Sequence, residues 1–272
     1  MNSSKTTTDV PTDAENSPLE FLAGTARVLV FDSLADSAAA AASHAAALIT
    51  EAVREKGKAR IIAATGNSQK AFIDALVLRK DVPWDQVTLF HMDEYVGISD
   101  THPASFRLWI RTRIEERVHP KEAHYIQGDA PDADAEAERY TRLLLSDEID
   151  VAFVGIGENG HIAFNDPPVA DFNDPKTVKS VALDDACKRQ QAGEGHFESV
   201  ATVPDRAITI TCPGLFRARA WITVVPDQRK AEAVKAALEG AITTKCPASI
   251  VRTHANATVY LDRPSASLLE KK

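Results

Sequence analysis

A histidine, an asparagine and an aspartate follow an apolar run near the middle of the chain. Residues 149–154 read IDVAFV, and residues 155–166 read GIGENGHIAFND, which contains Asn159, His161 and Asp166. A histidine with an unperturbed pKa of about 6.5 can transfer protons at neutral pH, and a neighbouring amide and carboxylate can fix its tautomer. The stretch therefore predicts a catalytic histidine. The structural alternative is a histidine that only bonds the loop backbone.

The same stretch contains the pattern G-x-G-x-x-G of dinucleotide-binding loops. In that motif the third glycine, here Gly160, opens a helix whose N-terminus faces a pyrophosphate. Here the chain continues as HIAFNDPPVADFNDP, residues 161–175, in which prolines and Asn/Asp clusters break helices. We therefore interpret the glycines as residues of a tight turn and not as a dinucleotide site.

Two adjacent acids end another strand-like run. The segment QVTLFHMDEYVG, residues 86–97, contains His91, Asp93 and Glu94. Partial burial and like charge both raise the pKa of a carboxyl, so one of these acids can serve as a general base. The alternative is that one acid caps a loop and the other is solvated.

The segment ATGNSQ, residues 64–69, is a glycine-containing turn between an expected strand and an expected helix. It offers the hydroxyls of Thr65 and Ser68, and backbone amides at a helix N-terminus bind anions. Lys230, in the first turn of the helix expected after VVPDQ, is suited to a second phosphate contact. The alternatives are an ordinary helix start, capped by Ser68 or Asn67, and a surface lysine.

These segments are positioned by short β-branched runs that alternate with longer Ala-, Leu-, Glu- and Lys-rich runs. We expect strands at 27–31, 59–64, 86–92, 149–157, 206–212, 219–226 and 257–262, and helices at 33–56, 69–79, 103–118, 134–146 and 227–240. We expect residues 165–204 to be rich in loops. Such alternation predicts a mainly parallel α/β sheet covered by helices on both faces, with ligands beyond the carboxyl ends of the strands.

Composition limits the class of protein. The 272 residues carry a formal net charge of -8 without a Lys/Arg-rich block, which argues against nucleic acid as a partner. Residues 1–20 contain no apolar signal or anchor segment, so we expect a disordered polar tail before a single domain at 21–272. Cys187, Cys212 and Cys246 have no C-x-x-C spacing, which argues against disulfides and zinc and favours a cytoplasmic location.

Together, these segments resemble the glucosamine-6-phosphate deaminase/isomerase family, in the superfamily that also holds the 6-phosphogluconolactonases. The match runs in order through ATGNS, VTLFHMDEYVGI, HPASFR, IDVAFVGIGENGHIAFNDP, RAITIT and DQRKAEAVKAALEG. MDEYVG and GHIAFN are highly specific, and GHIAFNDPP departs from the G-x-D-G-H-T-A-S-L-F-P motif of the lactonases. The resemblance implies a Rossmann-like α/β fold. It also implies that an amino sugar phosphate is ring-opened, isomerised from aldose to ketose and deaminated, without a metal or organic cofactor.

The resemblance also implies roles for individual residues. Asp93 would be the general base that moves a proton between C2 and C1, and His161 would assist ring opening with support from Asn159 and Asp166. The residues implied or expected to bind the substrate are Thr65, Gly66, Asn67, Ser68, Gly160, Lys188, Arg189 and Lys230.

The chain departs from the family pattern in three places. The phosphate loop T-G-G-T/S-P reads TGNSQ, so Asn67 adds a side chain where the backbone approaches the ligand. The acid after GHIAFN is usually glutamate, and Asp166 is one methylene shorter. The phosphate-binding arginine of the family falls at or near Gly193. Either Lys188 or Arg189 replaces it, or the ligand lacks the usual 6-phosphate geometry.

Two other functions fit parts of the pattern. A lactone hydrolase would use His161 to activate water and would have less use for Asp93. A non-catalytic sugar-phosphate sensor would need a DNA-reading segment, and the sequence offers no helix-turn-helix candidate before residue 26. We therefore predict a small amino sugar phosphate as the ligand and no nucleic-acid or membrane partner. Homo-oligomers are common for such proteins, although no apolar strip marks an interface.

Overall fold

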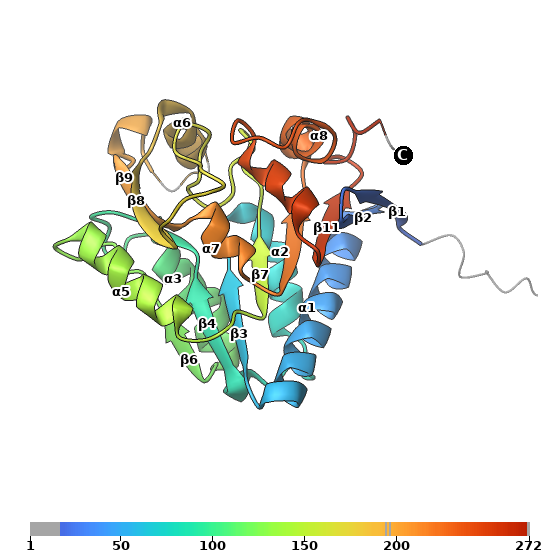
Figure 1. The fold of residues 1–272 in the computed structure, drawn as a ribbon, viewed down its shortest axis with the longest axis horizontal. Coiled ribbons are helices and arrows are strands. Elements are labelled where there is room, and N and C mark those ends of the chain that lie inside the picture. Colours follow the sequence, from blue (N-terminus) through green and yellow to red (C-terminus); the bar gives the residue numbers. More distant parts are fainter. Residues whose placement is uncertain (1–16, 194, 196, 271–272) are drawn as a thin grey trace, which may run out of the picture.

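An eight-stranded sheet forms the centre of the molecule, in the strand order β1-β2-β11-β10-β7-β3-β4-β6 (Figure 1). The computed structural model describes residues 17–193, 195 and 197–270. The strands are β1 (Leu19–Ala23), β2 (Ala26–Phe31), β3 (Ala59–Ala63), β4 (Val87–His91), β6 (Glu122–His124), β7 (Val151–Val154), β10 (Ala220–Val225) and β11 (Ala257–Asp262). Every neighbouring pair is parallel except β1 with β2. The predicted mainly parallel sheet is confirmed.

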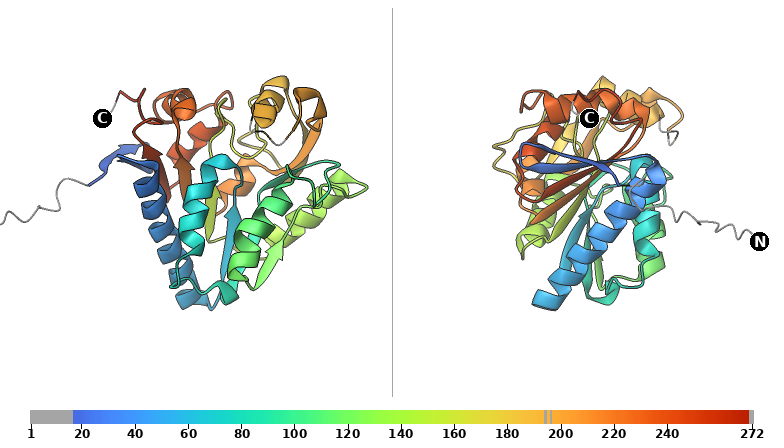
Figure 2. Two further views of the ribbon diagram at one scale, coloured as in Figure 1. Left: turned by 180° about the vertical axis from the view of Figure 1, so that it is seen from behind. Right: turned by 90° about the vertical axis from the view of Figure 1, so that its right-hand side faces the viewer.

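Helices cover both faces of this sheet, as expected for a Rossmann-like fold. They are α1 (Leu34–Lys56), α2 (Lys70–Val77), α3 (Phe106–Ile110), α4 (Glu116–Val118), α5 (Ala133–Leu145), α6 (Asp185–Gly193), α7 (Cys212–Phe216) and α8 (Ala231–Glu239). Short helical turns are η2 (Asn67–Gln69), η3 (Trp84–Gln86), η4 (Arg111–Glu115), η5 (Val200–Thr202), η6 (Gln228–Lys230) and η7 (Pro247–Thr253). The left view of Figure 2, which is turned by 180° from Figure 1, shows the face of the sheet that α1 and α2 cover. Neighbouring strand residues serve opposite cores: Ile61 packs in one and Ile62 in the other.

The long helix α1 shows how local sequence sets its ends. The side chain of Ser33 accepts a hydrogen bond from the backbone N–H of Asp36, which caps the N-terminus. Gly57 ends the helix in the left-handed region, with φ of 71°. Ala41 and Ala45 are fully buried between these ends, so the small side chains let the helix lie close to the sheet. The predicted helix at 33–56 is confirmed.

A second sheet was not foreseen. Strands β5 (Asp93–Tyr95), β9 (Arg206–Ile210) and β8 (Val178–Ala182) form an antiparallel sheet in the order β5-β9-β8. The expectation that residues 165–204 are mainly loop is therefore wrong for β8 and for α6. β8 is short and includes half-buried Lys179 and Ser180, so it lacks a clear apolar alternation and depends on partners distant in the chain.

The N-terminal boundary also differs from the expectation. Residues 1–16 of the expected tail lie outside the described residues. Strand β1 begins at Leu19 and pairs antiparallel with β2, so its first two residues belong to the sheet and not to a tail that ends at residue 20.

The winding of the main sheet reverses at its centre. From β3 the chain proceeds to β4 and β6 on one side, whereas from β7 it proceeds to β10 and β11 on the other. β3 and β7 are neighbours, so the loops that follow them separate at their carboxyl ends. Such a switch point is where open α/β sheets bind ligands.

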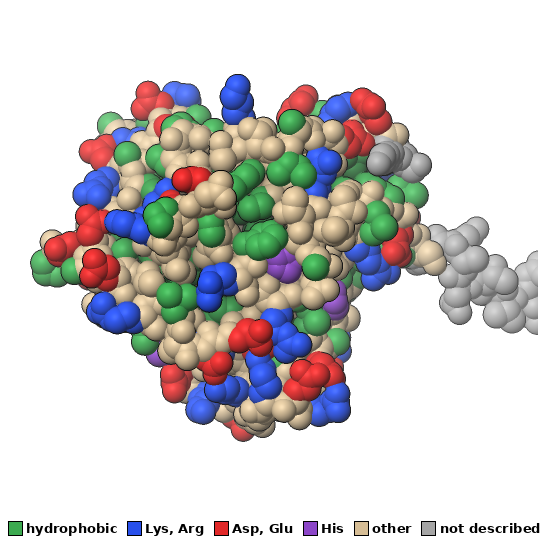
Figure 3. All heavy atoms as spheres, viewed as in Figure 1, with side chains coloured by type: hydrophobic (Ala, Val, Ile, Leu, Met, Phe, Trp, Pro, Cys, Tyr) green, Lys and Arg blue, Asp and Glu red, His purple; other side chains and the backbone are tan. Residues whose placement is uncertain are grey.

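The surface carries charges of both signs. On the face drawn in Figure 3, acidic and basic side chains are interspersed and do not form separate fields. Within the described part of the chain, no helix is long and apolar enough to cross a membrane.

Candidate active site

A pocket lies beyond the carboxyl ends of four neighbouring strands, β10, β7, β3 and β4. Six residues singled out from the sequence line it: Thr65, Gly66, Ser68, Asp93, His161 and Lys230. The segments after β3, β4, β7 and β10 each contribute, because parallel strands present their carboxyl ends at one edge. The structure therefore brings together residues that are far apart in the sequence.

His161 is held by Asp166 and Asn159. Its Nδ1 lies 3.0 Å from Oδ1 of Asp166, whose side chain is almost fully buried. The Nδ2 of Asn159 donates to the same carboxylate oxygen at 2.8 Å, and the Oδ1 of Asn159 accepts from the backbone N–H of His161 at 3.0 Å. Asp166 thus reaches the histidine despite being one methylene shorter than glutamate.

The environment of Asp166 keeps it ionised. Burial raises the pKa of this carboxyl, but hydrogen bonds from His161, Asn159 and Cys187 outweigh burial and leave the pKa below its usual range. A carboxylate beside Nδ1 favours the tautomer that carries its proton there, so Nε2 is left to accept or return a proton. The arrangement can perform general acid–base chemistry at the pocket.

The three glycines of the 155–160 turn serve packing and not a dinucleotide. A Cβ on Gly157 would lie 2.2–2.5 Å from three ring atoms of His161, so only glycine admits the ring in this position. Gly160 has φ of 83°. The chain after it forms a turn closed by a bridge between Ile162 and Asn165, and no helix follows. Gly160 itself does not line the pocket; its backbone carbonyl accepts from the N–H of Ala248.

Asp93 is the acid that faces the pocket. It is 7% exposed and begins β5, where it pairs with Thr209 of β9. Burial raises its pKa well above the ordinary value, and the negative charges of Glu94 and Asp166 raise it further. A carboxyl with a raised pKa is suited to take a proton from carbon.

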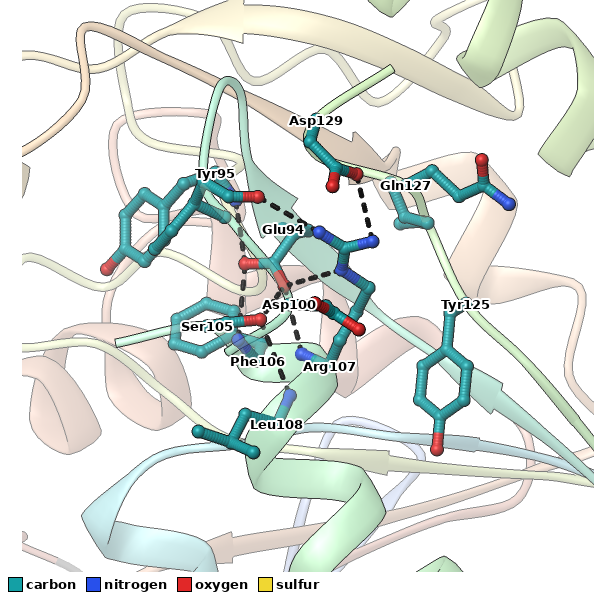
Figure 4. Close-up of polar contacts among 12 residues, drawn as sticks. Glu94, Tyr95, Asp100, Ser105, Phe106, Arg107, Leu108, Tyr125, Gln127 and Asp129 are labelled. Atoms are coloured by element: carbon teal, nitrogen blue, oxygen red, sulfur yellow. Dashed lines mark hydrogen bonds and ion pairs between the residues drawn. The ribbon is translucent and has the colours of Figure 1, made fainter. Parts of the chain in front are cut away.

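Glu94 has a different role, as Figure 4 shows. Its Oε2 accepts from the hydroxyl of Ser105 at 2.8 Å and from the backbone N–H of Arg107 at 2.9 Å, and its Oε1 accepts from the N–H groups of Tyr95 and Phe106. The fully buried carboxylate therefore caps α3, which begins at Phe106 and not at 103 as expected. Neighbouring strand residues face opposite ways. Glu94 therefore has the capping role of the structural alternative, whereas Asp93 lines the pocket and is buried and not solvated as that alternative expected.

His91 is part of the interior and does not line the pocket. It is fully buried, and its Nδ1 accepts from the backbone N–H of Ile126 at 3.3 Å. Burial lowers its pKa to about 3, so the ring is neutral. This histidine of the HMDEY segment is structural.

The turn after β3 supplies the pocket's hydroxyl groups. Gly66 has φ of 97°, a conformation that favours glycine, and precedes η2 and α2. Asn67 is exposed and lines an adjoining pocket that shares Ser68 and Lys230 with the first. The side chain of Asn67 therefore lies outside the first pocket and not where the backbone of the TGNSQ turn would approach a ligand.

Helix α6 does not place its two cations at the pocket. Lys188 forms an ion pair with the exposed Asp205, and Arg189 is exposed. Gln190 and Gln191 line the pocket instead. Lys188 and Arg189 therefore do not replace the family's phosphate-binding arginine at the pocket, because the face of α6 at the pocket carries Gln190 and Gln191.

Several lining residues were missed by the sequence reasoning. They are Ala64, Met92, Phe106, Gly155, Ile156, Gly157, Ala163, Phe164, Gln190 and Gln191. The two glutamines had no detectable signal, because the polar segment DACKRQQAG carries little helical periodicity of apolar residues. Among the described residues, no group of three or more His, Cys, Asp and Glu side chains is arranged to hold a metal ion. All three cysteines are free and buried.

Comparison with known proteins gives consistent matches. Residues 32–260 match the family described as glucosamine-6-phosphate isomerases/6-phosphogluconolactonase. A protein of Exiguobacterium sp. strain AT1b named glucosamine-6-phosphate deaminase is 39% identical over 181 residues, which cover 66% of this chain and 69% of the relative. A protein of the same name from Exiguobacterium sibiricum is 36% identical over 220 residues, which cover 80% and 84%.

Solved structures agree with these matches. One described as a monomeric glucosamine-6-phosphate deaminase has a TM-score of 0.80 and 29% identity, and the match covers 89% of this chain and 99% of the other. A 6-phosphogluconolactonase from Shewanella baltica has a TM-score of 0.72 and 18% identity, with 86% and 96% covered. At that lower identity the likeness concerns the fold alone.

Proposed function

The chain belongs to the glucosamine-6-phosphate isomerase/6-phosphogluconolactonase family, and on this premise we propose that it converts glucosamine 6-phosphate to fructose 6-phosphate and ammonia. The observation that carries the proposal is that buried Asp93 and the His161–Asp166 pair line or support one pocket at the switch point of the sheet. An aldose–ketose isomerisation needs these two groups: a base for a proton on carbon and an acid–base group for the ring oxygen.

His161 opens the sugar ring in the proposed reaction. Its ring passes a proton between the C1 hydroxyl and the ring oxygen, which breaks the hemiacetal bond and leaves the open-chain aldehyde. Asp166 stabilises the imidazolium that forms during the transfer, since its Oδ1 lies 3.0 Å from Nδ1. Asn159 orients the pair by bonding both the carboxylate and the backbone of His161.

Asp93 then acts on the open-chain sugar. Its carboxylate removes the C2 proton, the electron pair moves to the C1 carbonyl, and the carbonyl oxygen takes a proton from the C2 ammonium group, which gives an enolamine. Return of the proton to C1 produces an imine at C2, which water hydrolyses to the ketone and ammonia. The raised pKa of Asp93 strengthens it as a base and lets it hold the proton between the two carbons.

The phosphate group is held at the other wall of the pocket. Lys230 is largely buried there, and the hydroxyls of Thr65 and Ser68 and the turn at Gly66 line the same wall. A lysine attracts phosphate as a point charge, and hydroxyls donate to its oxygens. These residues would fix the end of the sugar remote from the reacting carbons.

Ammonia release and fructose 6-phosphate formation from glucosamine 6-phosphate test the proposal directly. The wild-type protein should form both products in equal amounts, and Asp93→Asn should lose turnover while still binding the substrate. A lactone hydrolase does not need a base for carbon. Hydrolysis of 6-phosphogluconolactone without ammonia release from any hexosamine phosphate would therefore refute the proposal.

A further inference from the structure

One face of α6 is turned towards the pocket. Cys187, Gln190 and Gln191 have the spacing i, i+3 and i+4, which places them on the same side of a helix. Cys187 is fully buried and donates to the carboxylate of Asp166. Gln190 and Gln191 line the pocket, and Gln191 is only 7% exposed. The helix therefore adds a wall of neutral amides to the site.

The oxygen of each amide already has a hydrogen-bond partner. The Oε1 of Gln190 accepts from the backbone N–H of Glu158 at 3.0 Å, and a backbone N–H can only donate. The Oε1 of Gln191 accepts from the hydroxyl of the buried Tyr95 at 2.6 Å. With both oxygens engaged, the two amide nitrogens, which donate, are the groups that remain for a ligand. Such donors match hydroxyl or carbonyl oxygens of a sugar.

The charges around α6 disfavour a phosphate at this wall. Cys187 lies against Asp166 and within the electrostatic influence of Asp93, so a dianion here would face two acids. Lys188 pairs with Asp205 away from the pocket. Among the described residues that line the pocket, Lys230 is the sole lysine or arginine. It immediately precedes α8, and α6 and α8 stand on opposite sides of the carboxyl end of β7 (Figure 1).

We propose that Gln190 and Gln191 determine specificity by donating hydrogen bonds to sugar hydroxyl oxygens, while the phosphate binds only at the Lys230 wall. This inference rests on the proposed function. It assigns opposite ends of the ligand to opposite walls of the pocket. The α6 wall thus recognises the hydroxyl groups of the sugar and not the negative charge of its phosphate.

The test uses Gln190→Glu and Gln191→Glu. Each keeps an oxygen for its existing partner, the N–H of Glu158 or the hydroxyl of Tyr95, replaces the donor by a second oxygen and adds one negative charge. Lys188→Met is the matched control, because it also lowers the charge of α6 by one and lies off the pocket. Thermal unfolding establishes that each variant is folded. Calorimetry then measures binding of glucitol 6-phosphate, an open-chain sugar phosphate that cannot react, and of inorganic phosphate.

Loss of one neutral hydrogen bond weakens binding by up to about 10-fold. We expect each Gln→Glu variant to weaken glucitol 6-phosphate binding by this factor relative to Lys188→Met, with phosphate binding equal to that of the control. An equal loss for both ligands would place the phosphate at α6 and overturn the inference, as would no loss for either. Calorimetry measures the binding of glucitol 6-phosphate without any turnover. A wild-type protein that binds glucitol 6-phosphate but releases no ammonia would therefore refute the proposed function and leave this inference testable.

Discussion

Replacing Gly157 by alanine tests whether the position of His161 controls catalysis. The new Cβ would lie 2.2 Å from Cε1 and 2.3 Å from Nε2 of the ring, whereas ordinary contact begins at 3.4 Å. The backbone of Gly157 is not in the left-handed region, so alanine meets no conformational barrier there. The ring must therefore move by about 1 Å or more, and it leaves hydrogen-bond distance of Asp166.

The expected loss follows from this displacement. A shift of about 1 Å in a catalytic group costs about 100-fold in rate, which corresponds to about 2.7 kcal/mol of transition-state stabilisation. Overpacking also destabilises the fold by about 1–3 kcal/mol, so urea unfolding should be measured beside activity. The assay is the steady-state rate of fructose 6-phosphate formation at a temperature where both proteins are folded.

Two controls test whether the loss of activity comes from displacement of the His161 ring. Gly193→Ala places a Cβ with no atom within 4 Å and should retain wild-type activity. The double variant with His161→Ala should be no slower than His161→Ala alone, because the alanine at 157 acts only through the ring. The reasoning is refuted if Gly157→Ala keeps kcat/KM within about threefold of wild type, less than the effect of one good hydrogen bond. It is also refuted if the alanine slows the enzyme equally without the histidine.

Further outcomes are expected for three groups: Asp93, Glu94 and Lys230. Because the folded-state pKa of Asp93 exceeds its unfolded value, the stability that this proton confers is complete below the unfolded pKa and is lost as pH rises through the folded pKa. Asp93→Asn should therefore raise the Tm above that pH, and the wild-type kcat/KM should rise with pH through the same range. Glu94→Ala removes the acceptor of the Ser105 hydroxyl and of the backbone N–H groups at the start of α3, whereas Arg107 keeps its ion pair with Asp129. Urea unfolding should therefore show a loss of about 1–3 kcal/mol; an unchanged midpoint would contradict the capping role. Lys230→Met should raise KM about 10–100-fold, whereas Lys188→Met should leave KM unchanged, and the reverse order would place the phosphate at α6.

The order of helices and strands was predictable because it depends on neighbours in the chain. Ser33 and Gly57 limit α1 through local hydrogen bonds and backbone conformation. The apolar runs of β3 and β7 indicated buried parallel strands, and glycines after them indicated turns. These signals were enough to place Asp93 and His161 at strand ends of one sheet.

The second sheet and α6 could not be predicted in the same way. β5 has three residues and is defined by pairing with β9, more than a hundred positions later in the chain. Contacts of that range leave no periodic pattern within a short window of sequence. The same reason hid Gln190 and Gln191, which lie at the pocket only because α6 packs there.

The sequence by itself determined which chemical groups the protein contains and which strands they follow. The tertiary structure alone decided how neighbouring groups divide their work: Asp93 faces the pocket and Glu94 caps a helix. It also decided that Asp166 reaches His161, since the turn through Gly157 and Gly160 brings the shorter side chain within 3.0 Å. Residue type is fixed by the chain, but burial, charge and contact depend on the elements that pack around each residue.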